Sequence, residues 1–206
     1  MKVGIIAASG KSGSLITDKC LQAGMDVTAF VRHPKKLVKN VPYQKRDIFD
    51  ISKKDVSDLD ILINAIGFPI GGEKKHIDVA QHLVSILNGS QTRLLVVGSA
   101  GHLYTDDSRT GKIYDNLGFM RTPSINFEKA YRYLKENAQF PWTFFAPAVN
   151  FEYSRPETDD YSLGTDVVLT NQNSESIIGY QDYTTALVNE IKSPKFINSM
   201  MTISEN

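Results

Sequence analysis

The segment from residue 3 to residue 13 constrains the fold of this chain more than any other feature. The apolar run Val3 to Ala8 predicts a short buried strand, and small residues follow it as far as Gly13. Apolar residues then recur at helical spacing from Leu15 to Leu21. A strand that turns tightly into a helix places free backbone N–H groups beside small residues, where a phosphate can approach them.

The spacing of the small residues fits a dinucleotide-binding fingerprint with one substitution. The pattern G-x-x-G-x-x-G corresponds here to Ala7, Gly10 and Gly13. A nucleoside triphosphate loop is the competing interpretation, because residues 10–12, Gly-Lys-Ser, end like G-x-x-x-x-G-K-[ST]. That motif fails on spacing, since Ile5 occupies the place of its first glycine. A plain strand–helix turn without a ligand also stays open, because such a glycine pattern alone is weakly specific.

The end of the second expected strand bears on cofactor choice. Residues 27–31 are rich in β-forming residues, and Arg32-His33-Pro34 follows them. NAD sites usually have Asp or Glu here to hold the ribose 2′-hydroxyl, whereas an arginine fork matches a 2′-phosphate in geometry and charge. The sequence therefore predicts a preference for NADPH, with an ordinary exposed charge as the alternative for Arg32.

Strands and helices continue to alternate along the chain. Further strands are expected at residues 42–46, 61–63, 94–97 and 142–145, and helices at 76–87 and 127–134. This pattern predicts one Rossmann-type, doubly wound α/β domain over residues 1–206, with a parallel sheet ordered 3-2-1-4-5-6. From about residue 150 onward Pro, Gly, Asp and Asn dominate, with strand-like pieces at 167–169 and 176–178. We expect residues 150–206 to contribute a small substrate cap and a late extra strand near 176–178.

Composition excludes several classes of function. Lys plus Arg and Asp plus Glu both number 23, so no net field attracts nucleic acid or a membrane. The single Cys20 excludes an internal disulfide and fits a reducing compartment, so a cytoplasmic protein is expected. His76 and His82 lie six residues apart, which does not bring them to one helix face, and no metal site is expected. The sequence leaves the oligomeric state open.

Motifs spread over nearly the full length resemble one known family. The segments are IIAASGKSG, FVRHPKKL, RDIFD, LDILINAIG, RLLVVGSAGHLY, WTFFAPAVNFE and SIIGYQDYTTALVNEI. Together they resemble the NAD(P)H-binding, NmrA-like group of atypical short-chain dehydrogenases, and within it the NADH-flavin reductases, which are related to biliverdin reductase B. The resemblance implies NAD(P)H-dependent reduction of a flavin or similar planar small-molecule acceptor, with NADP as the cofactor and FMN or FAD as a substrate. A regulatory protein that senses NADP without turnover, and a nucleotide-sugar epimerase or dehydratase, are the alternatives.

The resemblance also implies roles for individual residues. The turn from residue 7 to residue 13 would hold the pyrophosphate, Arg32 the 2′-phosphate, and Ser99 with the 147–148 turn would approach the nicotinamide. Asp47 and Ile48 would flank the adenine, and residues 65–67 would line the ribose. The expected cofactor-binding residues are thus Ala7, Ser9, Gly10, Lys11, Ser12, Gly13, Arg32, His33, Asp47, Ile48, Ala65, Ile66, Gly67, Ser99, Pro147 and Ala148. Asp182 and Tyr183 would lie on a late helix that closes the fold.

Two positions depart from the family's pattern. Ala7 replaces the usual first glycine, which costs little only if its φ is negative. Ser99 stands where the family often has a second glycine.

The expected catalytic residues are Ser99 and His102, because both follow the fifth strand and His102 could donate a proton near the nicotinamide. A merely solvated loop histidine is the alternative. Tyr131 and Lys135 match the letters of the Tyr-x-x-x-Lys pair of typical short-chain dehydrogenases. That pair should lie upstream, however, so we expect these two residues to pack rather than to catalyse. Phe151 and Tyr153 could pack on a planar acceptor ring or simply within the cap.

Overall fold

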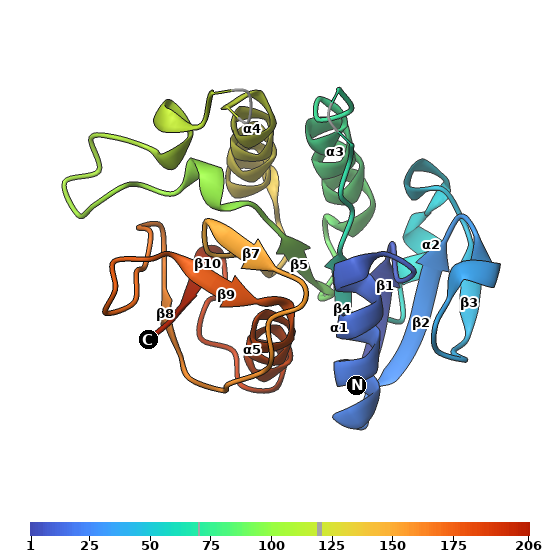
Figure 1. The fold of residues 1–206 in the computed structure, drawn as a ribbon. Coiled ribbons are helices and arrows are strands. Elements are labelled where there is room, and N and C mark those ends of the chain that lie inside the picture. Colours follow the sequence, from blue (N-terminus) through green and yellow to red (C-terminus); the bar gives the residue numbers. More distant parts are fainter. Residues whose placement is uncertain (70, 119–120) are drawn as a thin grey trace.

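An eight-stranded sheet organises the computed structural model, which describes residues 1–69, 71–118 and 121–206 (Figure 1). In spatial order its strands are β3 (Tyr43–Lys45), β2 (Asp26–Val31), β1 (Lys2–Ile6), β4 (Ile61–Asn64), β5 (Arg93–Val97), β6 (Trp142–Ala146), β10 (Ser199–Glu205) and β8 (Tyr161–Gly164). All neighbouring strands are parallel except β8, which pairs antiparallel with β10. The predicted order of the first six strands is confirmed.

The late strand predicted near 176–178 is present, but it does not join the main sheet. The strand there is β9 (Ile177–Gly179), which pairs with β7 (Asn150–Glu152) in a separate two-stranded sheet. The strand that extends the main sheet is β10, in parallel register with β6 from Ser199 opposite Thr143. Of the predicted strand-like piece 167–169, only Val167 forms an isolated bridge, to Tyr104.

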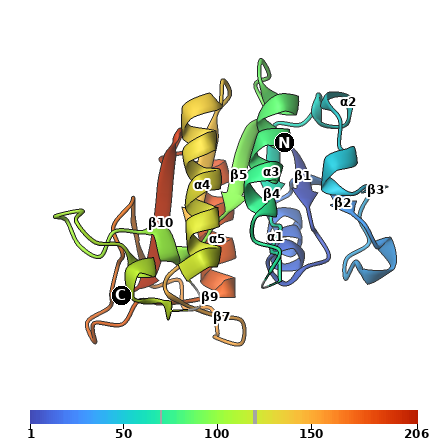
Figure 2. The same ribbon diagram turned by 90° about the horizontal axis from the view of Figure 1, so that it is seen from above.

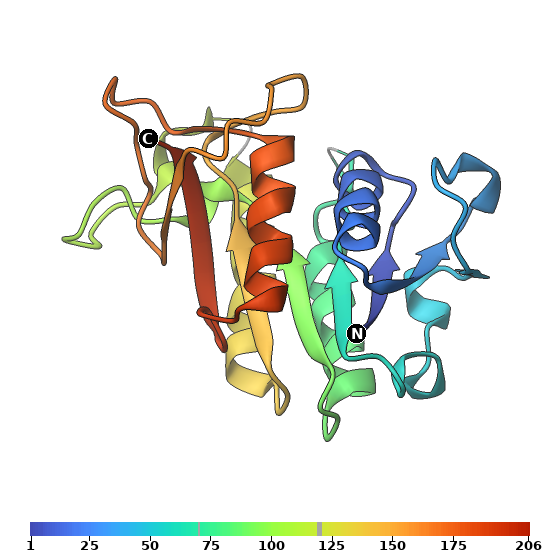
Figure 3. The same cartoon turned by 90° about the horizontal axis from the view of Figure 1, so that it is seen from below.

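Helices cover both faces of the sheet. Figures 2 and 3 show α1 (Lys11–Gln22) and α5 (Tyr180–Lys192) on one face, and α3 (Lys75–Leu87) and α4 (Arg121–Asn137) on the other. The short helix α2 (Lys53–Val56) and the 3-10 turns η1 (Pro34–Lys36), η2 (Ile48–Asp50), η3 (Ala100–His102) and η4 (Ile113–Asn116) complete the connections. Within the described ranges, no helix is long and apolar enough to cross a membrane.

Two apolar layers follow from this arrangement. Side chains of β1 alternate between them: Ile5 is buried in the layer under α1 and α5, and Ile6 in the layer under α3 and α4. Residues 61–64 and 142–146 are buried throughout, which explains why these strands are largely apolar, apart from Asn64 and Thr143, rather than alternating.

The turn from β1 into α1 is closed by close backbone packing. A Cβ added to Gly13 would lie 2.2 Å from the Ala7 carbonyl oxygen, so only glycine allows α1 to approach the strand end this closely. Ala7 has φ of +59°, in the left-handed region that disfavours every residue with a Cβ. The condition under which alanine would cost little at this position, a negative φ, is therefore not met.

We predict that Ala7→Gly raises the free energy of unfolding by about 0.5–1 kcal/mol. Relief of the left-handed conformation is worth about 1–2 kcal/mol, and the greater freedom of glycine in the unfolded chain offsets about 0.5–1 kcal/mol of it. Urea unfolding measures the change. The matched control is Ala8→Gly, because Ala8 is buried without a positive φ, and it should lower stability instead. A decrease for Ala7→Gly would show that the turn is not strained.

Candidate functional site

The N-terminus of α1 is open to a ligand. Gly10 is its N-cap residue, with extended backbone at φ −80° and ψ 173°, and its N–H donates to the Ala7 carbonyl at 2.9 Å. Among the described residues, no side chain caps this helix, its first turn holds no acid, and the N–H groups of residues 11–13 have no acceptor. Free N–H groups and the positive end of the helix dipole together form a site for an anion.

The residues of the turn leave this anion site accessible. Gly10 and Lys11 are exposed, and Ser9 and Ser12 are half-buried. A Cβ added to Gly10 would lie 3.2 Å from the Ala7 carbonyl oxygen, a tight but adjustable contact. A larger side chain at Gly10 would therefore occupy the space above the N–H groups without breaking the turn, whereas Gly13 is required by the fold itself.

The other expected cofactor residues lie along one edge of the sheet. Each group follows the carboxyl end of a parallel strand: Arg32 and His33 follow β2, Asp47 and Ile48 β3, residues 65–67 β4, Ser99 β5, and residues 147–148 β6. In open α/β sheets this edge is where ligands bind. The structure brings the expected residues to a common edge, and their individual roles stay predictions.

Side chains fix the backbone along this edge. The Asp47 carboxylate accepts from the Phe49 N–H at 3.3 Å, and the Asn64 side chain accepts from the Ile66 N–H at 3.2 Å. The Ser99 hydroxyl accepts from the Gly101 N–H at 3.3 Å, which starts η3. Polar side chains thus stabilise three of the turns that the ligand would contact.

Arg32 is exposed at the end of β2 and is free to bind a ligand. Within residues 1–69, 71–118 and 121–206 it forms no ion pair or hydrogen bond. Lys35 and Lys36 follow in η1 and are also exposed. The three cations give this end of the edge a positive potential suited to a phosphate.

His102 lies inside the protein. Its side chain is 2 % exposed, stacks on Tyr131 with ring centroids 5.9 Å apart, and meets the edge of Phe144 at 5.4 Å. Neither ring nitrogen has a hydrogen-bond partner among the described residues. Burial, assisted by the nearby Lys112 ammonium and opposed by Glu128, lowers the pKa of His102 to about 3. Because the ring is neutral and enclosed, it is not placed to donate a proton to a bound substrate, and His102 has no role in the function proposed below.

Tyr131 belongs to the same aromatic cluster. Its ring contacts Trp142 at 6.0 Å and Phe144 at 5.4 Å, edge to face. Burial raises the pKa of its hydroxyl, opposite to the shift that a catalytic tyrosine requires. Lys135, one turn later on α4, is exposed. These positions agree with the expectation that the pair packs rather than catalyses.

A series of stacked aromatic rings, here called the aromatic ladder, extends from the sheet to the start of α1, where the Lys11 ammonium lies 5.5 Å from the centre of the Tyr153 ring. Phe145 stacks on Tyr183 at 4.1 Å, Tyr183 meets Phe151 at 4.9 Å, Phe151 stacks on Tyr180 at 3.7 Å, and Tyr153 meets the edge of Tyr180 at 5.3 Å. Sequence reasoning singled out Phe151 and Tyr153 but missed Tyr180. Its position as the first residue of a helix that packs beside α1 is a tertiary property.

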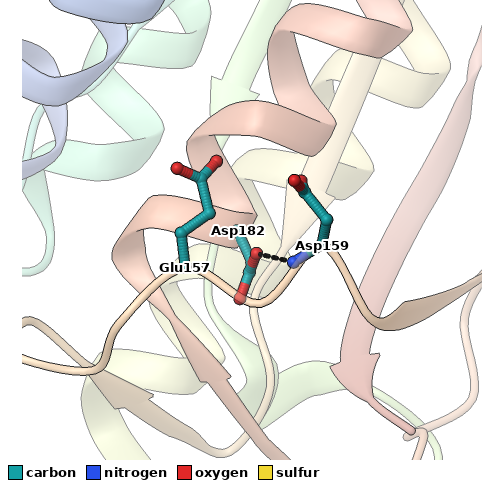
Figure 4. A group of neighbouring side chains, drawn as sticks. All are labelled: Glu157, Asp159 and Asp182. Carbon is teal, nitrogen blue, oxygen red and sulfur yellow. Dashed lines mark hydrogen bonds between the residues drawn. The ribbon is translucent and has the colours of Figure 1, made fainter.

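Three carboxylates, of Glu157, Asp159 and Asp182, lie within 4.8 Å of one another (Figure 4). Asp182 is fully buried and accepts from the backbone N–H groups of Thr158 and Asp159 at 2.9–3.1 Å. Glu157 pairs with Lys19 at 2.6 Å. The cluster thus holds the cap loop against α5 and α1, and we assign it a structural role.

An apolar pocket lies between the sheet, α3 and α4. It is lined in part by Asn64, Ile66, His76 and Phe127, and its cavity of about 20 Å³ holds roughly one water molecule. Burial lowers the pKa of His76 to about 4, with Glu73 acting in the opposite direction. The cavity is too small for a planar substrate.

Comparison with known proteins agrees with this geometry. A family model described as NAD(P)H-binding matches residues 7–178. The uncharacterized protein YwnB of Bacillus subtilis is 34% identical over 208 residues, covering 98% of each chain.

Two solved structures carry different functional descriptions. A Streptococcus pneumoniae protein described as a candidate NADH-flavin reductase superposes with a TM-score of 0.94, at 31% identity over the full length of both chains. A Bacteroides thetaiotaomicron protein described as a candidate epimerase gives a TM-score of 0.88 at 27% identity, covering 99% of this chain and 96% of that one. The reaction must therefore be argued from the site.

We predict that the buried histidines make the fold sensitive to acid. Unfolded histidine has a pKa of about 6.5, and burial lowers it for both His102 and His76. Their contribution to stability is therefore complete above about pH 6.5, and each loses about 1.4 kcal/mol per pH unit as the pH falls toward its folded pKa.

His102→Phe tests this prediction, because an apolar ring fits between Tyr131 and Phe144. The unfolding free energy, measured by urea titration from pH 7 to pH 4.5, should fall less steeply than in the wild type. His33→Gln is the control, since His33 is exposed, and it should leave the slope unchanged. An equal slope for His102→Phe and the wild type would mean that His102 is not held neutral.

Proposed function

Because this chain belongs to the NAD(P)H-binding family, in the NmrA-like group of atypical short-chain dehydrogenases, we propose that it is an NADPH-dependent oxidoreductase that reduces a flavin or similar planar acceptor. The observation that carries the proposal is the uncapped N-terminus of α1. Its free N–H groups suit a pyrophosphate, and Gly10 lets the phosphates approach the backbone.

Arg32 supports the choice of NADPH over NADH. It takes the place at the end of β2 where an acid would bind the ribose 2′-hydroxyl, and it has no partner in the described part of the chain. A guanidinium with all its donors free can bind a 2′-phosphate through two parallel hydrogen bonds. Lys35 and Lys36 add positive charge nearby.

The nicotinamide ring supplies the hydride when the cofactor is bound. Ser99 and the buried turn of Pro147 and Ala148 follow adjacent strands, β5 and β6, and would hold the ring between them. The acceptor would lie between residues 99–104 and residues 147–153. Residues 166–168 support segment 99–104, because the Tyr104 N–H donates to the Asp166 carbonyl at 2.8 Å and the Val168 N–H donates to the Tyr104 carbonyl at 2.9 Å.

Positioning supplies most of the rate in this proposal. Hydride transfer requires the donor and acceptor atoms in near contact, and walls built on strand ends provide that alignment. The raised pKa of Tyr131 and the enclosed ring of His102 speak against a side-chain acid comparable to the usual tyrosine–lysine pair.

A sensor that binds NADP without turnover is the second candidate. The observation in its favour is the packed position of Tyr131, which removes the usual catalytic pair while the cofactor edge stays intact. The same position counts against an epimerase or dehydratase, which normally needs that pair. Turnover separates the reductase from the sensor.

Arg32→Ala tests the cofactor preference. We expect NADPH to bind about 10–150-fold more weakly, which corresponds to about 1.5–3 kcal/mol for a lost charge-assisted contact, and NADH to change less than about threefold. Titration calorimetry measures both affinities. Lys129→Ala, which removes an exposed cation from α4, is the control for net charge. Equal weakening of NADPH and NADH would show that Arg32 does not bind the 2′-phosphate.

A turnover assay tests the reaction. We expect the protein to consume NADPH when FMN, FAD or a quinone is supplied as the acceptor. The loss of NADPH absorbance measures the rate. Tyr131→Phe and Lys135→Ala should keep kcat within about threefold of wild type, because a true general-acid pair would lose about 10²–10⁴-fold. Ser99→Val should lower kcat/KM by at least about tenfold through misplacement of the reactants.

Each outcome of the assay has a defined meaning. Loss of activity in Tyr131→Phe alone would restore the usual dehydrogenase mechanism. NADPH binding without consumption across the whole panel would favour the sensor.

A further inference from the structure

Tyr153 is the outermost and most exposed ring of the aromatic ladder. Its side chain is 50 % exposed, whereas the side chains of its neighbours Phe151 and Tyr180 are less exposed. Exposed aromatic rings supported by a rigid stack are suited to binding a planar ligand, because little side-chain entropy is lost on contact. The ladder is rigid at its base, where the Tyr183 hydroxyl donates to the Phe145 carbonyl at 2.8 Å.

Two features connect this platform, formed by the rings of Phe151, Tyr153 and Tyr180, to the start of α1. The Lys11 ammonium lies 5.5 Å from the centre of the Tyr153 ring. Tyr180 is the first residue of α5, which packs beside α1. The two features differ in kind: the packing of α5 on α1 fixes the platform, and Lys11, the first residue of α1, rests over its exposed ring at the anion site.

Lys11 has a stronger partner once a phosphate is present. At an exposed position the attraction between an ammonium and a tyrosine ring is weak, whereas a charge-assisted hydrogen bond from an ammonium to a phosphate is strong. A pyrophosphate at the N-terminus of α1 therefore draws the ammonium away from the ring. Tyr180 keeps its stack on Phe151 and α5 keeps its packing against α1, so the platform stays in place when Lys11 leaves.

We infer that Tyr153 selects a planar aromatic acceptor by stacking, and that Lys11 covers its ring until the cofactor's pyrophosphate binds. The inference rests on the proposed function, since it uses the same anion site, and it adds the acceptor-selecting residue and an order of binding. The cofactor binds first and the acceptor second.

The test uses FMN as the probe and NADP⁺ as the cofactor, because NADP⁺ cannot donate hydride. Quenching of flavin fluorescence measures the Kd of FMN with and without saturating NADP⁺, and calorimetry measures the Kd of NADP⁺ alone. In the wild type, FMN should bind about two- to fivefold more tightly when NADP⁺ is present.

Lys11→Ala gives the sharpest result. Without NADP⁺ it should bind FMN about two- to fivefold more tightly than the wild type does, although it has lost a cation and FMN is an anion. Its affinity for NADP⁺ should fall about tenfold, the loss of one phosphate contact. Lys135→Ala, an exposed lysine on α4, is the charge-matched control and should change neither affinity.

Tyr153→Leu tests the stacking role of Tyr153 separately from the covering role of Lys11. It should weaken FMN binding at least tenfold in the presence of NADP⁺ and leave NADP⁺ binding within twofold. Tyr43→Leu, at a tyrosine that is 56 % exposed on β3, is its control. Both test residues are exposed, so thermal melts of the variants should match the wild type.

The outcomes distinguish this inference from the proposed function. Failure of the wild type to bind NADP⁺ overturns the proposed function. Three results overturn the inference alone, provided that NADP⁺ binds. The first is that FMN does not bind. The second is that Tyr153→Leu leaves FMN binding unchanged, and the third is that Lys11→Ala weakens it.

Discussion

The contact between Gly13 and the Ala7 backbone is the constraint on which the rest of the molecule depends. It brings the first turn of α1 against the end of β1, in the middle of the parallel sheet, and so fixes where the free N–H groups lie. Ala7, whose carbonyl faces Gly13, has a left-handed conformation. The turn thus combines a helix start suited to phosphate with a local cost that the fold sustains, as is common at binding sites.

Local patterns in the sequence were sufficient for most of the scaffold and for bringing the expected cofactor residues to one edge of the sheet. The buried strand 61–64 begins with the apolar run 61–63, bounded by Asp60 and Asn64, and its place beside β1 follows from the short, right-handed connections of such folds. Arg32 could be placed at the ligand edge from sequence because it directly follows a strand. These features depend on neighbours that are near in the chain.

Features that depend on distant contacts were not predictable in this way. The apolar run Ile177–Ile178 has the composition of a core strand, yet it pairs with β7, and the less apolar segment 199–205 joins the sheet beside β6. His102 follows a strand and was expected near the ligand edge, yet it is enclosed by the rings of Tyr131 in α4 and Phe144 in β6, which are distant in the sequence. Composition alone does not determine which of two candidate strands reaches an open edge, or which loop a helix covers.

The parallel pairing of β7 with β9 has a consequence for how such a protein can diversify. It places Asn150 opposite Ile177, so the chain between β7 and β9 starts and ends side by side. Within this excursion, β8 joins the edge of the main sheet, residues 157–159 contact α1 and α5, and residues 166–168 contact Tyr104. The entropy of closing a loop grows slowly with its length, so lengthening the excursion between these contacts costs little stability. Its base adjoins the aromatic ladder, whose outermost ring, Tyr153, lies beside Lys11 at the start of α1. A lineage could therefore exchange one acceptor for another by altering a single excursion, and leave the cofactor edge as it was.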